Sequence, residues 1–418
     1  MAEVAAGIGG ARDVLADADV RRFVAERLRA DEYDGQRVCV IVPDGTRTCP
    51  LPLLLDAVYE ALAPRATALT ILVALGTHPA MSESQLAGLL GGPPAERFPR
   101  ATVRNHEWWD PERLVRIGHV DAARISRLSE GRLDTGVDIT VNRAVLEHDV
   151  LLVVGPVFPH EVVGFSGGNK YLFPGIAGQQ VIDVSHWLGA LITSSAMIGT
   201  RGDTPVRQLI NAAAELVPCR RRAFSMVVES GSTNLHSIAY GSPEASWARA
   251  ADVAAEAHVR YLDRPVRRVL SVIPGRYDEM WTAAKGMYKV EPVVAEGGEV
   301  VIYAPHVRTV SHTHGPAIEK IGYHCRDYFT GQWERFRDEP WGVLAHSTHL
   351  RGAGRWDPVT GERCRATVTL ATGIDERTTR ALGLEYRDPD GIDVSAWAED
   401  PETLVVPNAG EVLFRLRA

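Results

Sequence analysis

Runs of consecutive apolar residues alternate with segments of helical period along most of the chain. The apolar runs have the length of buried strands, and they cover Val38–Val42, Ala66–Leu75, Asp149–Phe158, Ala223–Glu229, Arg268–Ile273, Glu299–Tyr303 and Ala366–Ala371. Apolar residues recur every three or four positions in Leu51–Ala63, Ser82–Leu90, Gln179–Ile192, Pro205–Val217, Ala245–Leu262 and Glu279–Val294. Strands that alternate with helices form parallel sheets covered on both faces. The pattern therefore predicts an α/β fold with mainly parallel sheets.

The alternation is interrupted once, near residue 265. The helical pattern of Ala245–Leu262 runs into Asp263-Arg264-Pro265, and a new strand begins directly afterwards. Because 418 residues also exceed the usual size of one domain, we predict two α/β domains, residues 1–265 and residues 266–418. Clefts between domains are frequent ligand sites, so an active-site cleft is expected between them.

Charge and hydropathy exclude several kinds of partner. The chain carries 45 basic and 53 acidic residues, a formal net charge of −8, and without a basic excess we expect no nucleic-acid or membrane partner. No run approaches the roughly 20 apolar residues that span a bilayer, and the N-terminus lacks the basic and apolar regions of a signal peptide. The five scattered cysteines form no CxxC pair. That usage is typical of a reducing compartment, so a cytoplasmic protein is expected.

Lysine is rare in this chain. Only four of the 45 basic residues are lysine, namely Lys170, Lys285, Lys289 and Lys320. A lysine kept in such a background is a candidate for work that a guanidinium does not do, such as nucleophilic attack, a covalent link or a compact point charge. Lys170 and Lys285 lie in glycine-bearing segments and are the two candidates. For Lys289 and Lys320, chance survival within this compositional bias is the favoured interpretation.

Polar motifs follow two of the predicted strands. The first strand ends in Asp44-Gly45-Thr46-Arg47, where the planar guanidinium of Arg47 fits a carboxylate or a phosphate. The second ends in Leu75-Gly76-Thr77-His78, where His78 is a candidate general acid or base. Either motif alone is compatible with an ordinary turn. Because the loops at the carboxyl ends of parallel strands carry the ligand, the two motifs together favour a site.

The segment Gly155–Gly178 is the richest in glycine, with six glycines and three prolines in 24 residues. It contains His160 and Lys170, and His186 follows on the predicted helix Gln179–Ile192. Glycines let backbone N–H groups approach an anion closely. The segment has neither the GxxxxGK[ST] of a Walker A loop nor a GxGxxG that opens a helix. It therefore predicts an anion-contacting loop of another kind, beside a rare lysine.

Three further histidines are weaker candidates for the lining of the cleft. His106 lies in RNHEWWD, and His312 and His314 lie two residues apart in SHTHG. No CxxC or HExxH motif supports a zinc site. A zinc hydrolase built on the histidines of the strand-end and glycine-rich motifs would also lack an acidic base at motif spacing.

Together these motifs resemble those of the nickel-dependent lactate racemase family of 2-hydroxyacid racemases and epimerases. The matching segments are Asp44–Arg47, Leu75–His78, His160–Lys170 with Pro174-Gly175-Ile176 after it, His186, and Ala283–Gly286. They occur in order from residue 38 to about residue 305, about two thirds of the chain, and no motif is seen beyond that stretch.

The resemblance implies a cofactor and roles for named residues. The family's cofactor is a nickel pincer, a pyridinium-3,5-dithiocarboxylic-type mononucleotide attached to a lysine through a thioamide. The resemblance implies that Lys170 is the tether and that His186 is the protein ligand of nickel. It also implies that the N-terminal domain binds the cofactor and that the C-terminal domain closes the substrate cleft. His78 and His160 become the catalytic acid and base. The further contacts that it implies are Asp44, Thr46, Gly76, Ser166, Gly167 and Gly168 for the cofactor, and Arg47, Lys285, Trp281 and Thr282 for the substrate.

The chemistry implied by the resemblance is a reversible redox step. One histidine takes the hydroxyl proton while the C2 hydride moves to the cofactor, and the hydride then returns to the opposite face of a transient 2-keto acid. The implied partners are a small 2-hydroxyacid and the enzymes that build the cofactor, and a homo-oligomer is compatible with this assignment. Lactate-type members carry a glutamine where this chain has Thr282, so a larger or polyhydroxylated acid is expected rather than lactate.

Two other functions fit the same residues. A Schiff-base lyase or aldolase would use Lys170 or Lys285 as its amine and the histidines for proton transfer. A non-enzymatic two-domain protein would capture a carboxylate with Arg47, Lys285 and the glycine-rich loop, and it would be stabilised by the ligand without turnover.

Overall fold

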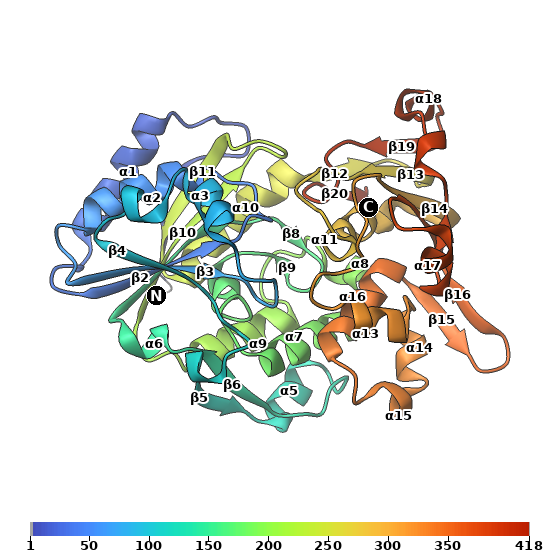
Figure 1. Cartoon of the computed structure of the whole chain (residues 1–418), viewed down its shortest axis with the longest axis horizontal. Coiled ribbons are helices and arrows are strands. Elements are labelled where there is room, and N and C mark those ends of the chain that lie inside the picture. Colours follow the sequence, from blue (N-terminus) through green and yellow to red (C-terminus); the bar gives the residue numbers. More distant parts are fainter. Residues whose placement is uncertain (1–2, 418) are drawn as a thin grey trace.

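The computed structural model describes residues 3–417 and consists of two lobes that lie side by side (Figure 1). The first lobe is built on a seven-stranded sheet with the order β1-β11-β10-β7-β2-β3-β4. The strands from β10 to β4 pair in parallel, and β11 pairs antiparallel with both β10 and β1. The bounds are β1 (Ala6–Gly9), β2 (Arg37–Pro43), β3 (Ala68–Ala74), β4 (Ala101–Asn105), β7 (Val150–Pro156), β10 (Arg220–Val228) and β11 (Leu235–Gly241).

The centre of this sheet is apolar on both faces. Every residue of β7 is buried, and in β2 only the first residue, Arg37, is exposed. Helices cover both faces, which is why these strands are continuous apolar runs rather than alternating ones. The chain passes from β2 outward to β3 and β4 and later returns to β7 on the other side of β2. The carboxyl ends of β2 and β7 therefore mark the reversal of strand order, where open α/β sheets bind their ligands.

Some helices of the first lobe begin at a residue whose side chain caps the helix. Ser82 and Gln85 form a capping box at the start of α3, and Thr204 followed by Pro205 starts α9. The bounds are α1 (Asp17–Ala30), α2 (Leu51–Leu62), α3 (Glu83–Leu90), α4 (Pro94–Arg97), α5 (Ala122–Leu128), α6 (Ala144–Glu147), α7 (Gln179–Ile192), α8 (Ser194–Met197), α9 (Pro205–Ala214) and α10 (Pro243–His258), with the 3-10 turns η1 (Pro111–Arg113) and η2 (Gly168–Tyr171). Two hairpins lie outside the main sheet, β5 (Leu114–Val120) with β6 (Val137–Asn142) and β8 (Pro159–His160) with β9 (Gly164–Phe165).

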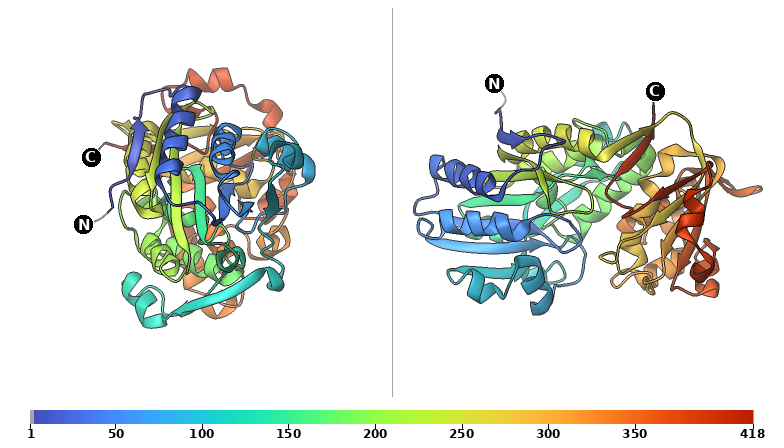
Figure 2. Two further views of the ribbon diagram at one scale, coloured as in Figure 1. Left: turned by 90° about the vertical axis from the view of Figure 1, so that its left-hand side faces the viewer. Right: turned by 90° about the horizontal axis from the view of Figure 1, so that it is seen from above.

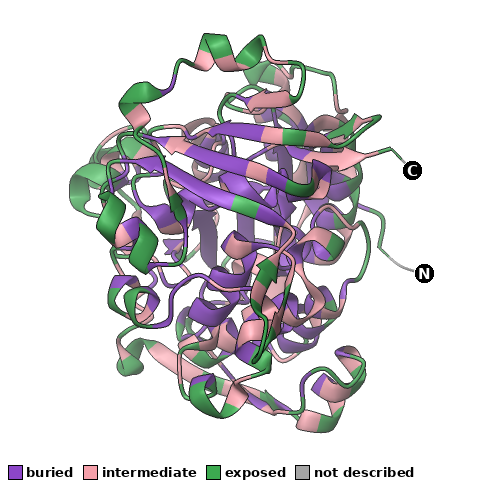
Figure 3. Ribbon diagram, turned by 90° about the vertical axis from the view of Figure 1, so that its right-hand side faces the viewer, coloured by how far each residue is buried: buried purple, intermediate pink, exposed green. Residues whose placement is uncertain are grey.

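The second lobe is built on five parallel strands in the order β18-β17-β14-β13-β19. The strands are largely buried, and the outer surfaces of the surrounding helices are exposed (Figure 3). The strands are β13 (Val266–Val272), β14 (Val294–Ala304), β17 (Ala366–Thr372), β18 (Glu385–Tyr386) and β19 (Thr403–Val406), with a hairpin of β15 (Gly354–Asp357) and β16 (Gly361–Cys364). The helices are α11 (Met280–Ala283), α12 (Lys285–Tyr288), α13 (Gly315–Ile321), α14 (Arg326–Thr330), α15 (Trp333–Phe336), α16 (Trp341–Arg351), α17 (Glu376–Ala381) and α18 (Val394–Ala398), with η3 (Glu291–Val293) and η4 (Pro389–Gly391). The predicted α/β class with mainly parallel sheets is confirmed.

Two of the predicted helices are wrong in part. The pattern of Ala245–Leu262 gives α10 only as far as His258, and the last four residues form β12 (Val259–Leu262), which pairs in parallel with β20 (Leu413–Leu416). The predicted helix Glu279–Val294 consists of three short pieces, α11, α12 and η3, and its last residue, Val294, pairs with Val266 in the sheet. In the first case pairing with a distant strand outweighs local propensity.

The β12–β20 pair brings the end of the chain back beside the segment that precedes the second lobe. Both ends of the described chain lie on the same side of the molecule (Figure 2). The domain boundary near residue 265 stays a prediction. Within residues 3–417, no helix combines the length and the apolar character needed to cross a membrane. All five cysteines lie in that range and are free thiols.

Candidate active site

A cavity of about 170 Å³ lies at the carboxyl ends of β2, β3 and β7, between the two lobes. The first lobe lines one side of it, and α11, α12 and α16 of the second lobe line the other. Of the residues singled out in the sequence, the cavity brings together Asp44, Thr46, Arg47, Gly76, His78, His160, Ser166, Gly167, Lys170, His186, Trp281, Thr282, Lys285 and His314. Motifs that are far apart in the sequence thus meet in one place.

The turn after β2 holds a buried carboxylate against a histidine. Asp44 Oδ1 accepts hydrogen bonds from the N–H (3.0 Å) and the hydroxyl (2.6 Å) of Thr46, and Asp44 Oδ2 lies 2.5 Å from Nδ1 of His78. Burial alone would raise the pKa of Asp44, but His78, Thr46 and Arg47 outweigh burial and bring that pKa below its usual value. The ionised carboxylate only accepts, so His78 donates from Nδ1, and in its neutral form the lone pair of His78 lies on Nε2.

His160, on the short strand β8, has the opposite tautomer. Its Nδ1 accepts a hydrogen bond from the backbone N–H of Val162 at 3.1 Å. Burial, followed by the charges of Lys170 and Arg47, lowers the pKa of His160 well below its usual value, although a Glu161 carboxylate oxygen lies 3.3 Å from the same nitrogen. A neutral imidazole that accepts at Nδ1 carries its proton on Nε2. The cavity therefore contains one histidine with a free acceptor nitrogen and one with a free donor.

The glycine-rich segment folds into the 3-10 turn η2, which carries Lys170. Gly167 and Gly168 have φ angles of 88° and 59°, which residues with side chains rarely adopt. A Cβ on Gly168 would lie 2.8 Å from Cβ of Trp247 on α10. The buried Arg207 of α9 donates a hydrogen bond to the carbonyl oxygen of Gly167 at 3.0 Å. The turn is therefore fixed by its packing against α9 and α10.

Three basic side chains, Arg47, Lys170 and Lys285, line the cavity. Burial, together with the charge of Arg47, lowers the pKa of Lys170 to about 7. The same two causes lower the pKa of Lys285 well below its usual value, although its Nζ lies 4.1 Å from the centre of the Tyr277 ring. A large share of Lys170 is therefore a neutral amine near neutral pH, which is the form that attacks an electrophile.

His186 lies on α7 with one ring nitrogen occupied. Its Nδ1 is 2.8 Å from the carbonyl oxygen of Ile182, and since a carbonyl only accepts, Nδ1 donates and Nε2 keeps its lone pair. Burial, together with the charge of Lys170, lowers the pKa of His186 to about 4. Histidine ligands of metals are commonly held in this way, with the second ring nitrogen bonded to a carbonyl. His186 thus has the tautomer that a metal ligand requires.

The wall of the cavity that the second lobe provides is aromatic. The Trp281 ring stacks on the ring of His346, with centroids 3.9 Å apart, and lies 4.5 Å from the ring of His314. His314 Nε2 is 3.1 Å from Oγ1 of Thr77, so this wall contacts the first lobe directly. Burial and the nearby His78 lower the pKa of His314 to about 4, and burial with the neighbouring His349 lowers that of His346 well below its usual value. Both imidazoles are therefore neutral.

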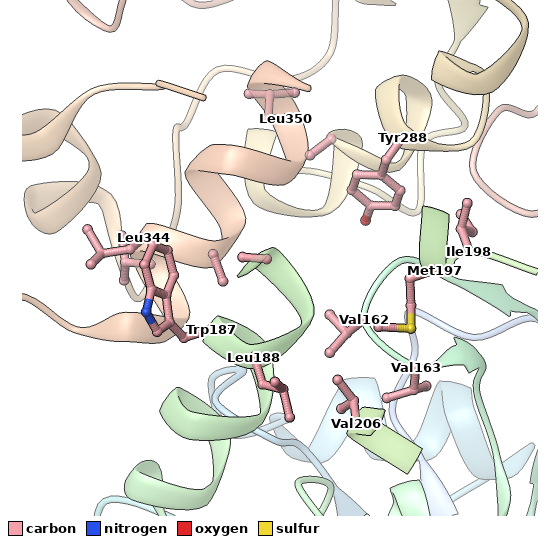
Figure 4. Packing of buried hydrophobic residues seen from close by; sticks show 14 of the residues in the cluster. Val162, Val163, Trp187, Leu188, Met197, Ile198, Val206, Tyr288, Leu344 and Leu350 are labelled. Atoms are coloured by element: carbon pink, nitrogen blue, oxygen red, sulfur yellow. The ribbon is translucent and has the colours of Figure 1, made fainter. Parts of the chain in front are cut away.

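Two histidines of α16 also line the cavity, and no sequence motif predicts them. His346 and His349 lie one helical turn apart, and both line the cavity. Nε2 of His349 is buried, and no group within residues 3–417 bonds it. Helix α16 reaches the cavity because it packs along α7, where Trp187 lies against Leu344 (Figure 4). The only sequence signal is a pair of histidines at helical spacing in an apolar segment, which is also typical of a structural core.

Lys289, for which the sequence predicts no special role, contacts the strand that carries His160. Lys289 is buried and donates a hydrogen bond to the carbonyl oxygen of Pro159, directly before His160. Burial lowers the pKa of Lys289 to about 8. Lys320, in contrast, has an exposed side chain that pairs with Glu339. Lys289 therefore supports the strand that carries His160.

Three candidate residues lie outside the cavity lining. The prediction that His106 lines the cleft is wrong, because its ring is fully buried and bonds the carbonyl oxygen of Ala177 (3.0 Å) and the amide of Asn142 (3.2 Å). His312 is exposed and lines an adjoining cleft instead. Gly168 packs against α10, and its contact with a cofactor stays a prediction.

The adjoining cleft is more open than the cavity and has a volume of about 630 Å³. The cavity and the cleft share Asp44, Arg47, His78 and Thr282 in their linings. Thr282 is buried, and its hydroxyl donates to the carbonyl oxygen of Glu279 at 3.2 Å. Thr282 thus borders both spaces.

Comparison with known proteins finds similar sequences. Residues 23–199 match the family model described as the lactate racemase N-terminal domain. The chain is 26% identical over 291 residues to the lactate racemase of Thermoanaerobacterium thermosaccharolyticum and 27% identical over 290 residues to that of Lactiplantibacillus plantarum. Each alignment covers 67% of this chain, and the chain spans 62% of the length of these curated relatives.

Two solved structures have a similar fold. The crystal structure of a protein from Thermotoga maritima superposes with a TM-score of 0.90 at 34% identity, over 98% of this chain and 100% of that one. The lactate racemase apoprotein from Thermoanaerobacterium thermosaccharolyticum superposes with a TM-score of 0.72 at 18% identity, over 97% of this chain and 94% of that one. The second likeness shows a shared fold.

Proposed function

Because residues 23–199 match the lactate racemase N-terminal domain and the chain is similar to two curated lactate racemases, we propose that it is an isomerase, namely a nickel-dependent racemase or epimerase of a 2-hydroxyacid. One observation carries the proposal. A lysine with a depressed pKa, Lys170, and a neutral histidine with a free Nε2, His186, line the same cavity. The proposed cofactor is the nickel pincer, a pyridinium-3,5-dithiocarboxylic-type mononucleotide covalently attached to Lys170.

The donor set of the cavity fits this cofactor. A thioamide link needs a reactive amine, and the pKa of Lys170 is lowered to about 7 by burial and by Arg47. Nickel accepts a neutral imidazole as a ligand, and His186 offers one with its other nitrogen held by Ile182. When bound, the cofactor supplies an acceptor for the C2 hydride of the substrate. Its proposed further contacts are Asp44, Thr46, Gly76, Ser166, Gly167 and Gly168.

His78 and His160 are the proposed acid and base. A racemase needs a proton acceptor for the substrate hydroxyl in each direction of the reaction. His78, which in its neutral form has a lone pair on Nε2, can accept that proton, and His160, with its proton on Nε2, can donate a hydrogen bond to the substrate oxygen. The two histidines exchange these roles between the two directions.

Arg47 and Lys285 are the proposed partners of the substrate carboxylate. Both line the cavity, and within residues 3–417 neither side chain forms an ion pair. A guanidinium binds a carboxylate through two parallel hydrogen bonds, which fixes its orientation. A bound carboxylate would also raise the pKa of Lys285, because an opposite charge stabilises the ammonium form. Substrate binding is thereby coupled to protonation of Lys285.

The proposed substrate is larger or more hydroxylated than lactate. Thr282 borders both the cavity and the open cleft, so a short side chain at this position leaves room for a longer acid. Trp281 offers an aromatic face, and the neutral rings of His314 and His346 beside it each have one donor and one acceptor nitrogen. Neutral donors and acceptors suit hydroxyl groups better than a second carboxylate. We expect hydroxylated acids to exceed lactate in kcat/KM by roughly 10-fold to 100-fold.

The test is the mass and the metal content of protein made in a host that builds the cofactor. We expect nickel in the purified protein and an adduct on the tryptic peptide that contains Lys170, together with racemisation or epimerisation of at least one acid in a panel from lactate to hexonates. Unmodified Lys170 in protein that is nevertheless active would overturn the assignment.

A Schiff-base lyase or aldolase is the second candidate, and a specific observation favours it. The depressed pKa values of Lys170 and Lys285 also suit an amine that condenses with a keto group. Borohydride added with a 2-keto acid distinguishes the two functions, because only the Schiff-base enzyme would form a stable reduced adduct on one of these lysines.

A further inference from the structure

Two thiols and a carboxylate lie close together in the second lobe, outside the active site. The Sγ atoms of Cys325 and Cys364 and a carboxylate oxygen of Glu362 all lie within 4.8 Å of one another. Cys325 is buried directly before α14, while Glu362 and Cys364 are half-buried on β16. Both cysteines are free thiols.

The local fold holds these three side chains together. Gly354 pairs with Cys364 in the β15–β16 hairpin, and a Cβ on Gly354 would lie 2.9 Å from Cβ of Cys325. Only a glycine therefore lets Cys325 approach β16 so closely. The Glu362 carboxylate accepts hydrogen bonds from the backbone N–H of Cys325 (2.5 Å) and lies 3.1 Å from Nδ1 of His324.

We propose that Cys325, Cys364 and Glu362 bind a zinc ion, with solvent in the fourth position. Thiolate sulfur and carboxylate oxygen are both zinc ligands, and at a Zn–S distance of about 2.3 Å two thiolates in a tetrahedral site stand about 3.8 Å apart. The observed spacing within 4.8 Å needs only a small adjustment to reach that geometry.

The groups around the cluster suit a metal as well. Two thiolates and a carboxylate bring one more negative charge than zinc neutralises, and Arg351 Nε, 3.8 Å from Glu362 Oε2, offsets it. The ring of His324 stacks on Tyr328 with centroids 3.6 Å apart, and its Nδ1 lies 3.1 Å from the same carboxylate oxygen, Oε2 of Glu362. Partners of this kind orient ligands and tune affinity without touching the metal.

The zinc would stabilise the segment that carries the second-lobe side of the cavity. Within residues 3–417, β15 and β16 pair only with each other, and an isolated two-stranded hairpin is marginally stable. The three ligands join this hairpin to the start of α14, and Arg351 is the last residue of α16, which also carries His346 and His349. The role of the zinc is thus structural and does not depend on the nickel cofactor.

The experiment uses the full chain with His186→Ala as the background, so that the active-site histidine does not contribute metal. The protein is reduced, stripped with chelator, equilibrated with Zn²⁺ and analysed for metal after gel filtration, and a parallel sample is loaded with Co²⁺. We expect about one zinc per chain and a thiolate-to-cobalt charge-transfer band in the near ultraviolet. Cys364→Ser and Glu362→Gln should each lose stoichiometric zinc, and His324→Ala should weaken zinc affinity by about 10-fold to 100-fold.

Cys219→Ser, which removes a half-buried thiol of the first lobe, is the matched control and should keep both the zinc and the cobalt band. Circular dichroism identifies any variant that fails to fold, and Glu362→Gln, which leaves both thiols in place, decides the question if Cys364→Ser is unfolded. The proposal is overturned by a wild-type chain that binds no stoichiometric zinc, by a cobalt spectrum without a thiolate band, or by a Cys325–Cys364 disulfide that persists under reducing conditions.

Discussion

The two walls of the cavity are built by different means. The first-lobe wall, made of Asp44, Arg47, His78, His160, Lys170 and His186, stands at strand ends and on α7, and backbone groups or a buried carboxylate fix its three histidines. The second-lobe wall, made of Trp281, Thr282, His314, His346 and His349, lies on α11, on α16 and in the turn before α13, and the Trp281 ring packs against the rings of His314 and His346. Its histidines are neutral, and none of them is held by a carboxylate in the same way.

This difference separates two tasks. Groups with a fixed tautomer and a shifted pKa are what proton transfer, covalent attachment and metal binding require. Stacked rings with free donors and acceptors shape a space and tolerate different ligands. We therefore expect changes in the first-lobe wall to remove activity, and changes in the second-lobe wall to alter which acid is preferred.

The largest effect is expected for Lys170→Arg. The substitution keeps the charge but removes the amine, so the cofactor has no point of attachment, and we expect a loss of activity of roughly 10³-fold or more. Activity and the mass of the peptide around residue 170 are measured on protein from a cofactor-building host. Lys320→Arg, at an exposed ion pair with Glu339, is the matched control. If Lys170→Arg keeps full activity and bound cofactor, Lys170 is not the point of attachment, and both walls of the cavity would serve substrate binding alone.

The second prediction concerns Asp44, which positions His78. Asp44→Asn keeps the size of the side chain but no longer forces the proton onto Nδ1 of His78, so part of the population loses its acceptor on Nε2. We expect kcat to fall by about 10²-fold to 10⁴-fold with a much smaller change in KM.

The pH profile of kcat separates positioning from damage to the fold, because a positioning role changes the profile. The control is Asp149→Asn, which breaks the exposed pair with Arg37. An unchanged kcat and pH profile in Asp44→Asn would show that the tautomer of His78 does not limit the reaction.

The same contrast explains what the sequence predicts and what it does not. The first-lobe wall arises from short segments in which glycine, a charged residue and a strand end occur together, and the central strands are marked by apolar runs such as Val38–Val42. A local pattern of this kind fixes both the loop and its place at the sheet edge. Asp44, His78 and Lys170 are therefore readable from the sequence.

The second-lobe wall depends on contacts between distant segments. His346 and His349 sit in an apolar helix, and only the packing of α16 along α7 brings them to the cavity. The strand β12 is likewise hidden in a helical pattern, because its partner, β20, is distant in the sequence, near residue 415. The contact of Lys289 with β8 is also absent from the local sequence pattern. Tertiary packing determines the positions of the two histidines, of β12 and of Lys289, and a local sequence period carries no information about tertiary packing.

A substitution in the second-lobe wall sharpens the comparison. His346→Leu keeps an apolar group against Trp281 but removes the ring nitrogens that would meet a substrate hydroxyl. We expect kcat/KM for hydroxylated acids to fall by about 10-fold to 100-fold relative to lactate, whose rate should change little. Thr348→Val, on the same helix and absent from the cavity lining, is the control. An equal loss for every acid in the panel would place His346 among the groups needed for the reaction itself.

The smallest effect is expected in the acid stability of the second-lobe wall. Burial lowers the pKa of His349 to about 4 against the opposing influence of Glu161, whereas an unfolded histidine has a pKa of about 6.5. Between these two pH values His349 is protonated in the unfolded chain but not in the folded chain. The free energy of unfolding therefore decreases as the pH falls from about 6.5 to about 4. For this residue the loss between about pH 7.5 and about pH 5 amounts to about 2 kcal/mol.

His349→Gln should flatten the pH dependence of the unfolding free energy by that amount, measured by denaturant titration at each pH, even if it lowers the absolute stability. His312→Gln, at an exposed position, is the matched control. Identical slopes for the wild type and His349→Gln would mean that the folded chain accepts a proton on His349, and the second-lobe wall would then carry charge as the first-lobe wall does.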